Sequence, residues 1–168
     1  GTDRLAEANQ ELGFDFVVNV QGDEPLIKPD AIVQVIEEYL EHPGRVVNAM
    51  CALTDEEGFK SVNVPKVVSS LSGRLCYMSR AGIPSDKILA NCHGYKQVCI
   101  YAFGKEHLEF FRANPNKSPL ESLEDIEILR FVENDIPVQM VDVGEGSMAV
   151  DTPEDAEKVE LEIRRRQT

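Results

Sequence analysis

The chain has 168 residues, of which 42% are apolar and 28% charged, and this is enough for one globular domain with a buried core. Its formal net charge of −13 argues against a surface for nucleic acid or for an anionic membrane, because such surfaces need clustered lysine and arginine. No stretch is long and apolar enough to predict a membrane span. The four cysteines show no Cys-x-x-Cys spacing, so we expect reduced, structural thiols in a cytoplasmic protein.

The first part of the chain alternates between helix and strand patterns. Residues 5–12 predict a helix, and residues 14–20 predict an apolar strand of the kind found in parallel sheets that are covered on both faces. A second helix is predicted from Pro29 to the break at residues 42–44, followed by a strand over residues 45–53. This alternation predicts a doubly wound α/β layer structure.

The turn Gln21-Gly22-Asp23-Glu24-Pro25 directly follows the first strand. Ligands of open α/β sheets bind just outside the carboxyl ends of the strands, so this turn is the first candidate site. Taken without its context, an Asp-Glu-Pro sequence after a strand is more often a turn and helix cap than a metal site.

The middle of the chain differs in kind. Residues 64–70 and 74–79 predict two strands around a hairpin turn at residues 71–73, and neither has a helix pattern beside it. A strand over residues 96–103 closes the region. We interpret residues 61–95 as an antiparallel arm inserted into a single domain, and we expect this arm to form a dimer contact.

The last part returns to α/β order. A short helix is predicted over residues 105–112, and Ser118-Pro119-Leu120-Glu121 predicts a strong helix start with a capping box. Residues 137–143 predict the final strand, and a terminal helix follows Thr152. The residues expected to be buried in these last two helices are Leu123, Ile126, Leu129, Phe131, Val132, Ala156, Val159 and Ile163.

Three motifs, at residues 21–25, 118–121 and 150–155, resemble in their order and separation those of the CMP-Kdo synthetases, the 3-deoxy-manno-octulosonate cytidylyltransferases. Residues 1–7 and 79–84 also fit that pattern, so the resemblance runs nearly end to end. It implies the nucleotidyltransferase fold, a Rossmann-like three-layer α/β sandwich, and from the arm at residues 61–95 we expect a homodimer.

The resemblance also implies a reaction: transfer of CMP from CTP to a 2-keto-3-deoxy sugar acid, with release of pyrophosphate, in the synthesis of lipopolysaccharide or another surface polysaccharide. Asp23 and Asp151 match the carboxylates with which this family binds Mg²⁺. Magnesium prefers oxygen ligands and takes one or two protein carboxylates, leaving its other positions to water and phosphate. Both aspartates are therefore expected to be catalytic as well as metal-binding.

The same resemblance assigns the remaining roles. Gln21 would contact substrate and Arg4 would lie near the cytosine, whereas the residues expected at the sugar site are Gln97, Tyr101, Glu121 and Glu124. The family commonly has His where this chain has Gln97, and Gln where it has Ile128. This change in hydrogen-bonding groups suggests 8-amino-3,8-dideoxy-manno-octulosonate as an alternative to Kdo.

One element of the family pattern has no counterpart in the sequence. The family begins with a glycine- and arginine-bearing loop that holds the triphosphate, and nothing in this chain resembles it. We therefore expect a cytidylyltransferase truncated by its N-terminal third, with an incomplete nucleotide site. The alternatives are a catalytically incomplete fragment, a nucleotide-sugar binding module and an acidic structural protein.

Several candidate residues also have plain structural interpretations. Residues 121–127 carry four acidic side chains that could form a solvated helix face, and residues 152–155 are explained by a helix start alone. Lys66 and Arg80 could be strand-edge cations or phosphate ligands. Two of the three histidines, His42 and His107, are expected at the surface.

Overall fold

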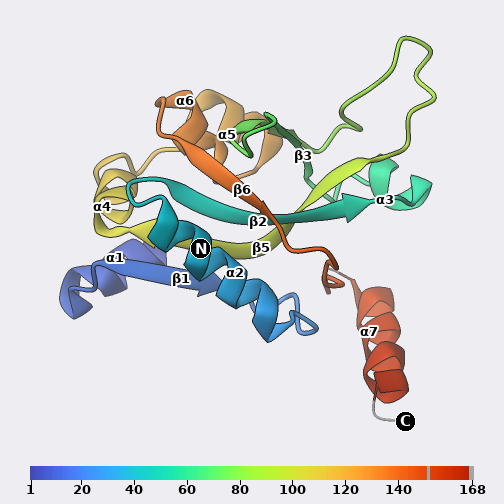
Figure 1. The fold of residues 1–168 in the computed structure, drawn as a ribbon, viewed down its shortest axis with the longest axis horizontal. Coiled ribbons are helices and arrows are strands. Elements are labelled where there is room, and N and C mark those ends of the chain that lie inside the picture. The colour runs from blue at the N-terminus through green and yellow to red at the C-terminus, as the bar shows by residue number, and fades with distance from the viewer. Residues whose placement is uncertain (151, 167–168) are drawn as a thin grey trace.

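The computed structural model describes residues 1–150 and 152–166 and shows a twisted sheet with helices on both faces (Figure 1). Six strands form the sheet in the described part of the chain, in the order β4-β3-β5-β2-β6, with β1 beside β5. The strands are β1 (Phe16–Val20), β2 (Val46–Leu53), β3 (Lys66–Ser69), β4 (Leu75–Ser79), β5 (Gly94–Gly104) and β6 (Val138–Asp142). The helices are α1 (Thr2–Leu12), α2 (Pro29–Glu41), α3 (Glu56–Lys60), α4 (Lys105–Ala113), α5 (Pro119–Glu124), α6 (Leu129–Glu133) and α7 (Pro153–Arg166).

Two apolar cores lie on opposite faces of this sheet. Strand β2 contributes Val46 and Met50 to the core that α1, α4 and α6 cover, and Val47 and Ala49 to the core that α2 covers. Successive side chains of a strand point to opposite faces, so an almost continuous apolar run is needed when both faces are buried. The predicted three-layer α/β architecture is confirmed.

The directions of the strands differ from the expectation. Strand β2 runs parallel to β6, but β1 pairs antiparallel with β5, so the prediction of a parallel neighbour for β1 was wrong within the described sheet. Strand β5 is long enough to have both strands as neighbours, because its last residues pair with β1 and its first residues pair with β3. An apolar pattern reports burial of both faces and carries no information on strand direction.

The predicted hairpin is present as β3 and β4, and it continues the main sheet through the pairing of β3 with β5. Its turn contains Gly73 at φ 79°, a left-handed conformation that favours glycine, and the backbone N–H of Met140 in β6 donates to the Gly73 carbonyl. The loop of residues 80–93 projects from this part of the molecule (Figure 1). A dimer contact of this arm stays a prediction.

Several burial predictions were wrong. The helix expected after Ser118 is two short helices, α5 and α6, because Asp125 adopts a left-handed conformation between them, and this leaves Leu123 exposed. Helix α7 extends away from the sheet (Figure 1) and buries Val159, whereas Ala156 and Ile163 stay exposed. A helix that leaves the body of the domain has little surface on which to pack a full stripe.

Two polar residues lie far deeper than their sequence context suggested. Lys66 and His107 are buried, whereas Cys76, one of the four thiols expected to be structural, is exposed. All four cysteines are free. None of the described helices combines the length and the apolar character that crossing a membrane requires.

Candidate functional site

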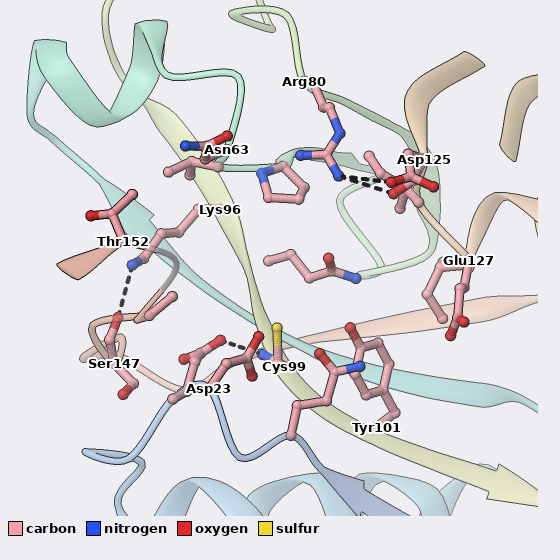
Figure 2. Close-up of a pocket in the computed structure, with 18 residues that line it drawn as sticks. Asp23, Asn63, Arg80, Lys96, Cys99, Tyr101, Asp125, Glu127, Ser147 and Thr152 are labelled. Atoms are coloured by element: carbon pink, nitrogen blue, oxygen red, sulfur yellow. Dashed lines mark hydrogen bonds and ion pairs between the residues drawn. The ribbon is translucent and has the colours of Figure 1, made fainter. Parts of the chain in front are cut away.

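A cavity of about 470 Å³ lies where β1 ends, beside β5. Figure 2 shows its side chains converging from the turn after β1, from β5, from the segment before β3 and from the segment after β6. Its lining residues are Gln21, Asp23, Glu24, Asn63, Val64, Pro65, Arg80, Lys96, Gln97, Cys99, Tyr101, Asp125, Ile126, Glu127, Ile128, Ser147, Ala149 and Thr152.

The turn after β1 is held at both ends by the backbone. The Gln21 N–H donates to the Cys99 carbonyl at 3.1 Å, and the Asp23 carbonyl accepts from the Val150 N–H at 2.8 Å. Between these anchors Asp23 is exposed at the cavity, whereas Glu24 is buried beside it. The turn therefore presents two adjacent carboxylates with different access to water.

Gln97 is oriented by a buried amide in the neighbouring strand. Its Nε2 donates to Asn48 Oδ1 at 2.9 Å, and Asn48 Nδ2 in turn donates to the carbonyls of Val98 and Ile100. Asn48 lies at the register shift between β2 and β5, where a ladder carbonyl would otherwise lack a partner. The irregularity in the sheet thus fixes the side chain of a cavity residue.

Tyr101 and Cys99 form a neutral wall. Tyr101 is buried and stacks on Phe103 with ring centroids 5.8 Å apart. Burial raises the pKa of the Tyr101 hydroxyl well above its ordinary value, and burial together with the charge of Glu24 raises the pKa of the Cys99 thiol. Both groups are therefore protonated at neutral pH and can donate hydrogen bonds.

The cavity has two cationic residues, and both are tethered to backbone carbonyls. The Arg80 guanidinium donates to the carbonyls of Val62, Glu124 and Asp125, and Lys96 Nζ donates to the Ser147 carbonyl at 2.9 Å. Each keeps further N–H groups with which it could contact an anion. Arg80 follows β4 and Lys96 lies in β5, so the two positive charges come to the cavity from different elements.

Lys66 is buried between two segments that border the cavity. Its fully buried ammonium donates to the carbonyls of Ser61 and Arg80, at 2.7 and 2.5 Å, and burial lowers its pKa. Of the two interpretations of Lys66, neither the strand-edge cation nor the phosphate ligand describes this position. It ties the segment before β3 to the residue that follows β4.

The structure brings together four of the predicted site residues: Gln21, Asp23, Gln97 and Tyr101 all line the cavity. Arg4 is exposed on α1 and is not among the lining residues. Asp151, the second predicted metal ligand, lies outside the described residues.

Glu121 and Glu124 do not line the cavity either, because both are engaged elsewhere. The Glu121 carboxylate is 1% exposed and accepts two hydrogen bonds of 2.6 Å from Arg130. The Glu124 carboxylate accepts from the Ser79 hydroxyl, the Tyr77 hydroxyl and the Arg80 N–H. Glu124 thereby fastens α5 to β4 and supports the cavity indirectly.

Sequence reasoning missed Lys96 and Ser147 and gave no separate role to Glu24. A lysine in an otherwise apolar strand pattern is a signal that could have pointed to Lys96. Ser147 offered no signal, because its place in the cavity depends on how the segment after β6 folds back towards the turn after β1.

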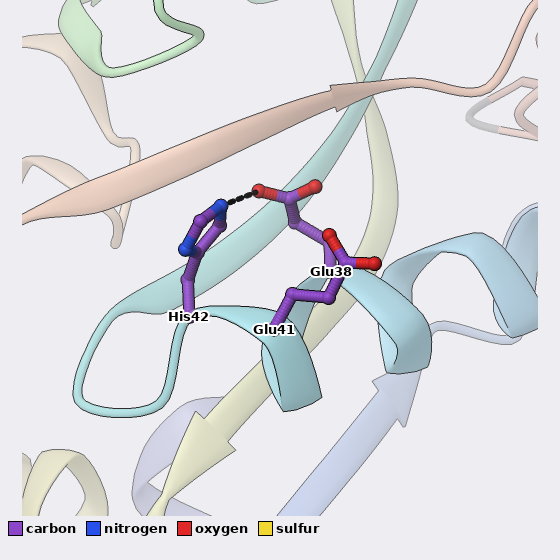
Figure 3. Close-up of side chains that lie close together, drawn as sticks. All are labelled: Glu38, Glu41 and His42. Atoms are coloured by element: carbon purple, nitrogen blue, oxygen red, sulfur yellow. Dashed lines mark ion pairs between the residues drawn. The ribbon is translucent and has the colours of Figure 1, made fainter.

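A second group of potential metal ligands lies at the end of α2, where Glu38, Glu41 and His42 come within reach of one another (Figure 3). His42 Nε2 is 3.4 Å from Glu38 Oε1, one helical turn away. Of the three, Glu41 and His42 reach furthest into solvent, around the helix end. An ion pair of this kind explains the grouping without a bound ion.

Comparison with known proteins identifies the family of the chain. A family model described as "Cytidylyltransferase" matches residues 1–141. The chain belongs to this cytidylyltransferase family. Among curated members, it is 36% identical over 174 residues to the 3-deoxy-manno-octulosonate cytidylyltransferase of Syntrophotalea carbinolica, covering 98% of this chain and 69% of the relative. Identity to the enzyme of the same name from Geobacter sulfurreducens is 38% over 173 residues, covering 95% and 68%.

The fold agrees with this cytidylyltransferase assignment. A solved structure of CMP:2-keto-3-deoxy-manno-octonic acid synthetase complexed with CTP matches with a TM-score of 0.88 at 28% identity. The match covers 98% of this chain and 68% of the solved one. The resemblance to the CMP-Kdo synthetases and the nucleotidyltransferase fold predicted from the sequence motifs are therefore confirmed.

Proposed function

We propose that this cytidylyltransferase transfers CMP from CTP to the anomeric hydroxyl of a 2-keto-3-deoxy sugar acid of the Kdo type, with release of pyrophosphate. The observation that carries the proposal is the single cavity that collects Gln21, Asp23, Gln97 and Tyr101 from the turn after β1 and from β5. The names of the two curated relatives and of the CTP-bound solved structure support the choice of CTP and of the sugar acid.

The donor set at the turn after β1 fits Mg²⁺. Asp23 offers a carboxylate to the cavity at the end of a strand, and oxygen donors of this kind are what the ion prefers. By the sequence motif, Asp151 would be the second ligand. When bound, the ion would neutralise phosphate charge and lower the pKa of the attacking hydroxyl.

The chain's own residues would bind and orient the substrates. Lys96 could pair with a carboxylate or phosphate group, because the Ser147 carbonyl occupies one of its three N–H donors. The Tyr101 hydroxyl and the Gln97 amide offer hydrogen bonds from β5. Ile128 is buried, lines the same cavity and would exclude water from that side.

The proposal also concerns which sugar acid accepts the CMP group. The Gln97 amide is already engaged with Asn48, and the neighbouring Ile128 offers no hydrogen bond, so this wall is poorer in polar partners than a His and Gln pair would be. We retain 8-amino-3,8-dideoxy-manno-octulosonate as the alternative acceptor. Steady-state kcat/KM on both sugars decides between them, and equal values would remove the amino sugar.

The proposal also includes a homodimer and a cytoplasmic location. The loop of residues 80–93 exposes Ile88 and Leu89, which supports a homodimer contact through this arm. Sedimentation equilibrium of the protein at micromolar concentration tests it, and a monomer would exclude it. The free cysteines support a reducing, cytoplasmic location.

Replacing Asp23 by Asn tests the reaction. We expect pyrophosphate release from CTP, Mg²⁺ and Kdo to fall by at least about 100-fold, since a bound metal supplies several kcal/mol of transition-state stabilisation. The Tm should not change, because Asp23 is exposed. The matched control is Asp30→Asn on α2, which is also exposed and lies outside the cavity. Retained turnover in Asp23→Asn would refute the assignment.

A second candidate, a nucleotide-sugar binding module, is favoured by the scarcity of cations in the cavity. Arg80 and Lys96 are the cationic lining residues, and both spend N–H groups on backbone carbonyls. A triphosphate carries about four charges at neutral pH, so weak binding of CTP would support this candidate. Calorimetry with CTP and Mg²⁺ separates the two, because sub-micromolar affinity together with turnover would exclude a mere binding module.

A further inference from the structure

Two residues that line the cavity each carry a buried oxygen atom without a hydrogen-bond partner. These atoms are Oε2 of Glu24 and the hydroxyl oxygen of Ser147, and each residue is 6% exposed. Among residues 1–150 and 152–166, these are the two buried side-chain polar atoms without a partner. Buried polar groups are nearly always paired, so two exceptions in one cavity call for a partner that the chain does not itself supply.

Both residues are held in place by backbone contacts. Glu24 Oε1 accepts from the Cys99 N–H at 2.8 Å, which fixes the carboxylate against β5 and leaves Oε2 free for another donor. The Ser147 carbonyl accepts from Lys96 Nζ. The preceding Gly146 packs so closely on β2 that a Cβ there would lie 2.4 Å from Cys51 Sγ. The Glu24 carboxylate and the Ser147 backbone are therefore both held at the cavity.

The neighbouring groups do not satisfy this carboxylate. The Cys99 thiol lies beside it, and burial with the Glu24 charge keeps the thiol protonated, but a thiol is a weak donor. The nearest cavity ammonium, Lys96, is directed to the Ser147 carbonyl. A buried carboxylate whose protein partners are one backbone N–H and one weak thiol donor costs free energy that strong donors from a ligand would offset.

We propose that Glu24 and Ser147 form a polar subsite that binds hydroxyl groups of the sugar acid, with Glu24 as a specificity-determining residue. A hydroxyl group can donate to Glu24 Oε2, and another can donate to or accept from the Ser147 hydroxyl. A polyhydroxylated acceptor supplies several such groups, whereas Asp23 beside Glu24 is left for the metal. This inference rests on the proposed function, because it names the part of the sugar site that reads hydroxyl groups.

Removing a polar group that only a ligand satisfies should not destabilise the ligand-free protein, but it should weaken binding of the sugar acid. Glu24→Gln removes a buried charge but keeps an oxygen that can accept from the Cys99 N–H, and Ser147→Ala removes an unpaired hydroxyl. Without ligand, Ser147→Ala should raise the Tm by about 3 °C, because the unsatisfied group is removed. Glu24→Gln should leave the Tm unchanged or higher, because it removes the charge but places an amide NH2 without a partner at the same position. A purely structural role would lower the Tm instead.

Calorimetric titration of wild type and variants with Kdo, and separately with CTP, tests the proposal in the presence of Mg²⁺. We expect the Kd for Kdo to rise about tenfold in Glu24→Gln, because a charge-assisted hydrogen bond becomes a neutral one, and to rise similarly in Ser147→Ala. The Kd for CTP should stay within twofold. Glu37→Gln, an exposed residue on α2, is the matched control and should change neither value.

The outcomes separate the subsite from the reaction. If the wild type binds Kdo but both variants bind it equally well, the subsite is wrong and the proposed function stands. A loss confined to CTP or to Mg²⁺ affinity would assign Glu24 to the nucleotide or the metal and also overturn the proposal. If the wild type binds no sugar acid, the proposed function fails and the subsite fails with it. Should Glu24→Gln fold poorly, Ser147→Ala decides, since its hydroxyl has no partner to lose.

Discussion

The buried ion pair between Glu121 and Arg130 leads to the sharpest prediction on stability. It joins α5 to α6 across the break at Asp125, with two hydrogen bonds of 2.6 Å between side chains that are 1% and 3% exposed. The Arg130 guanidinium also lies 3.7 Å from the centre of the Phe111 ring. The geometry is the bidentate, fully desolvated kind in which loss of one partner leaves an uncompensated charge.

We expect Glu121→Gln to destabilise the protein by about 3 kcal/mol, at the lower end of the 3–5 kcal/mol typical of a broken buried pair, because Gln keeps one acceptor for Arg130. In a chain of this size about 1 kcal/mol corresponds to 2–4 °C, so the Tm should fall by about 10 °C. The double variant Glu121→Gln/Arg130→Met should recover part of this loss, since no buried charge remains.

Differential scanning calorimetry of Glu121→Gln, Arg130→Met and the double variant measures the coupling energy between the two side chains. The matched control is Glu160→Gln, which breaks an exposed pair with Arg164 on α7 and should shift the Tm by less than about 2 °C. The reasoning would be refuted if Glu121→Gln melted like this control. A raised KM for the sugar acid without a change in Tm would instead return Glu121 to the sugar site, where the sequence motif had placed it.

Two further predictions concern the buried basic residues Lys66 and His107. Lys66→Met should lower the free energy of unfolding by about 2–4 kcal/mol in urea titration, because it leaves the buried carbonyls of Ser61 and Arg80 without a donor. A change below about 1 kcal/mol would contradict a structural role for these two hydrogen bonds. Burial lowers the pKa of His107, so the stability from its neutral form is complete above about pH 6.5, the unfolded value, and declines as the pH falls towards the folded value. The Tm should therefore drop between pH 7 and 5.5 more steeply in wild type than in His107→Gln, and equal slopes would show that this histidine does not titrate with unfolding.

The sequence by itself determined most of the local structure and the family. Hydrophobic periodicity placed the helices and strands of the first part of the chain, and Ser118 with Pro119 marked the start of α5. These signals are local, because helix and strand periods and capping residues act within a few positions. The motif at residues 21–25 likewise identified the turn that borders the cavity, since a short segment carries the whole pattern.

Only the tertiary structure decided which polar residues face the cavity and which are internal. Glu24 meets Cys99 across 75 positions of sequence, and the Glu121 carboxylate, expected at the sugar site, is directed to Arg130. The antiparallel pairing of β1 with β5 depends in the same way on distant segments. A carboxylate or an ammonium has the same appearance in a sequence whether it is solvated, paired or left without a partner. What separates these states is desolvation and the positions of partners, which exist only once the chain has folded.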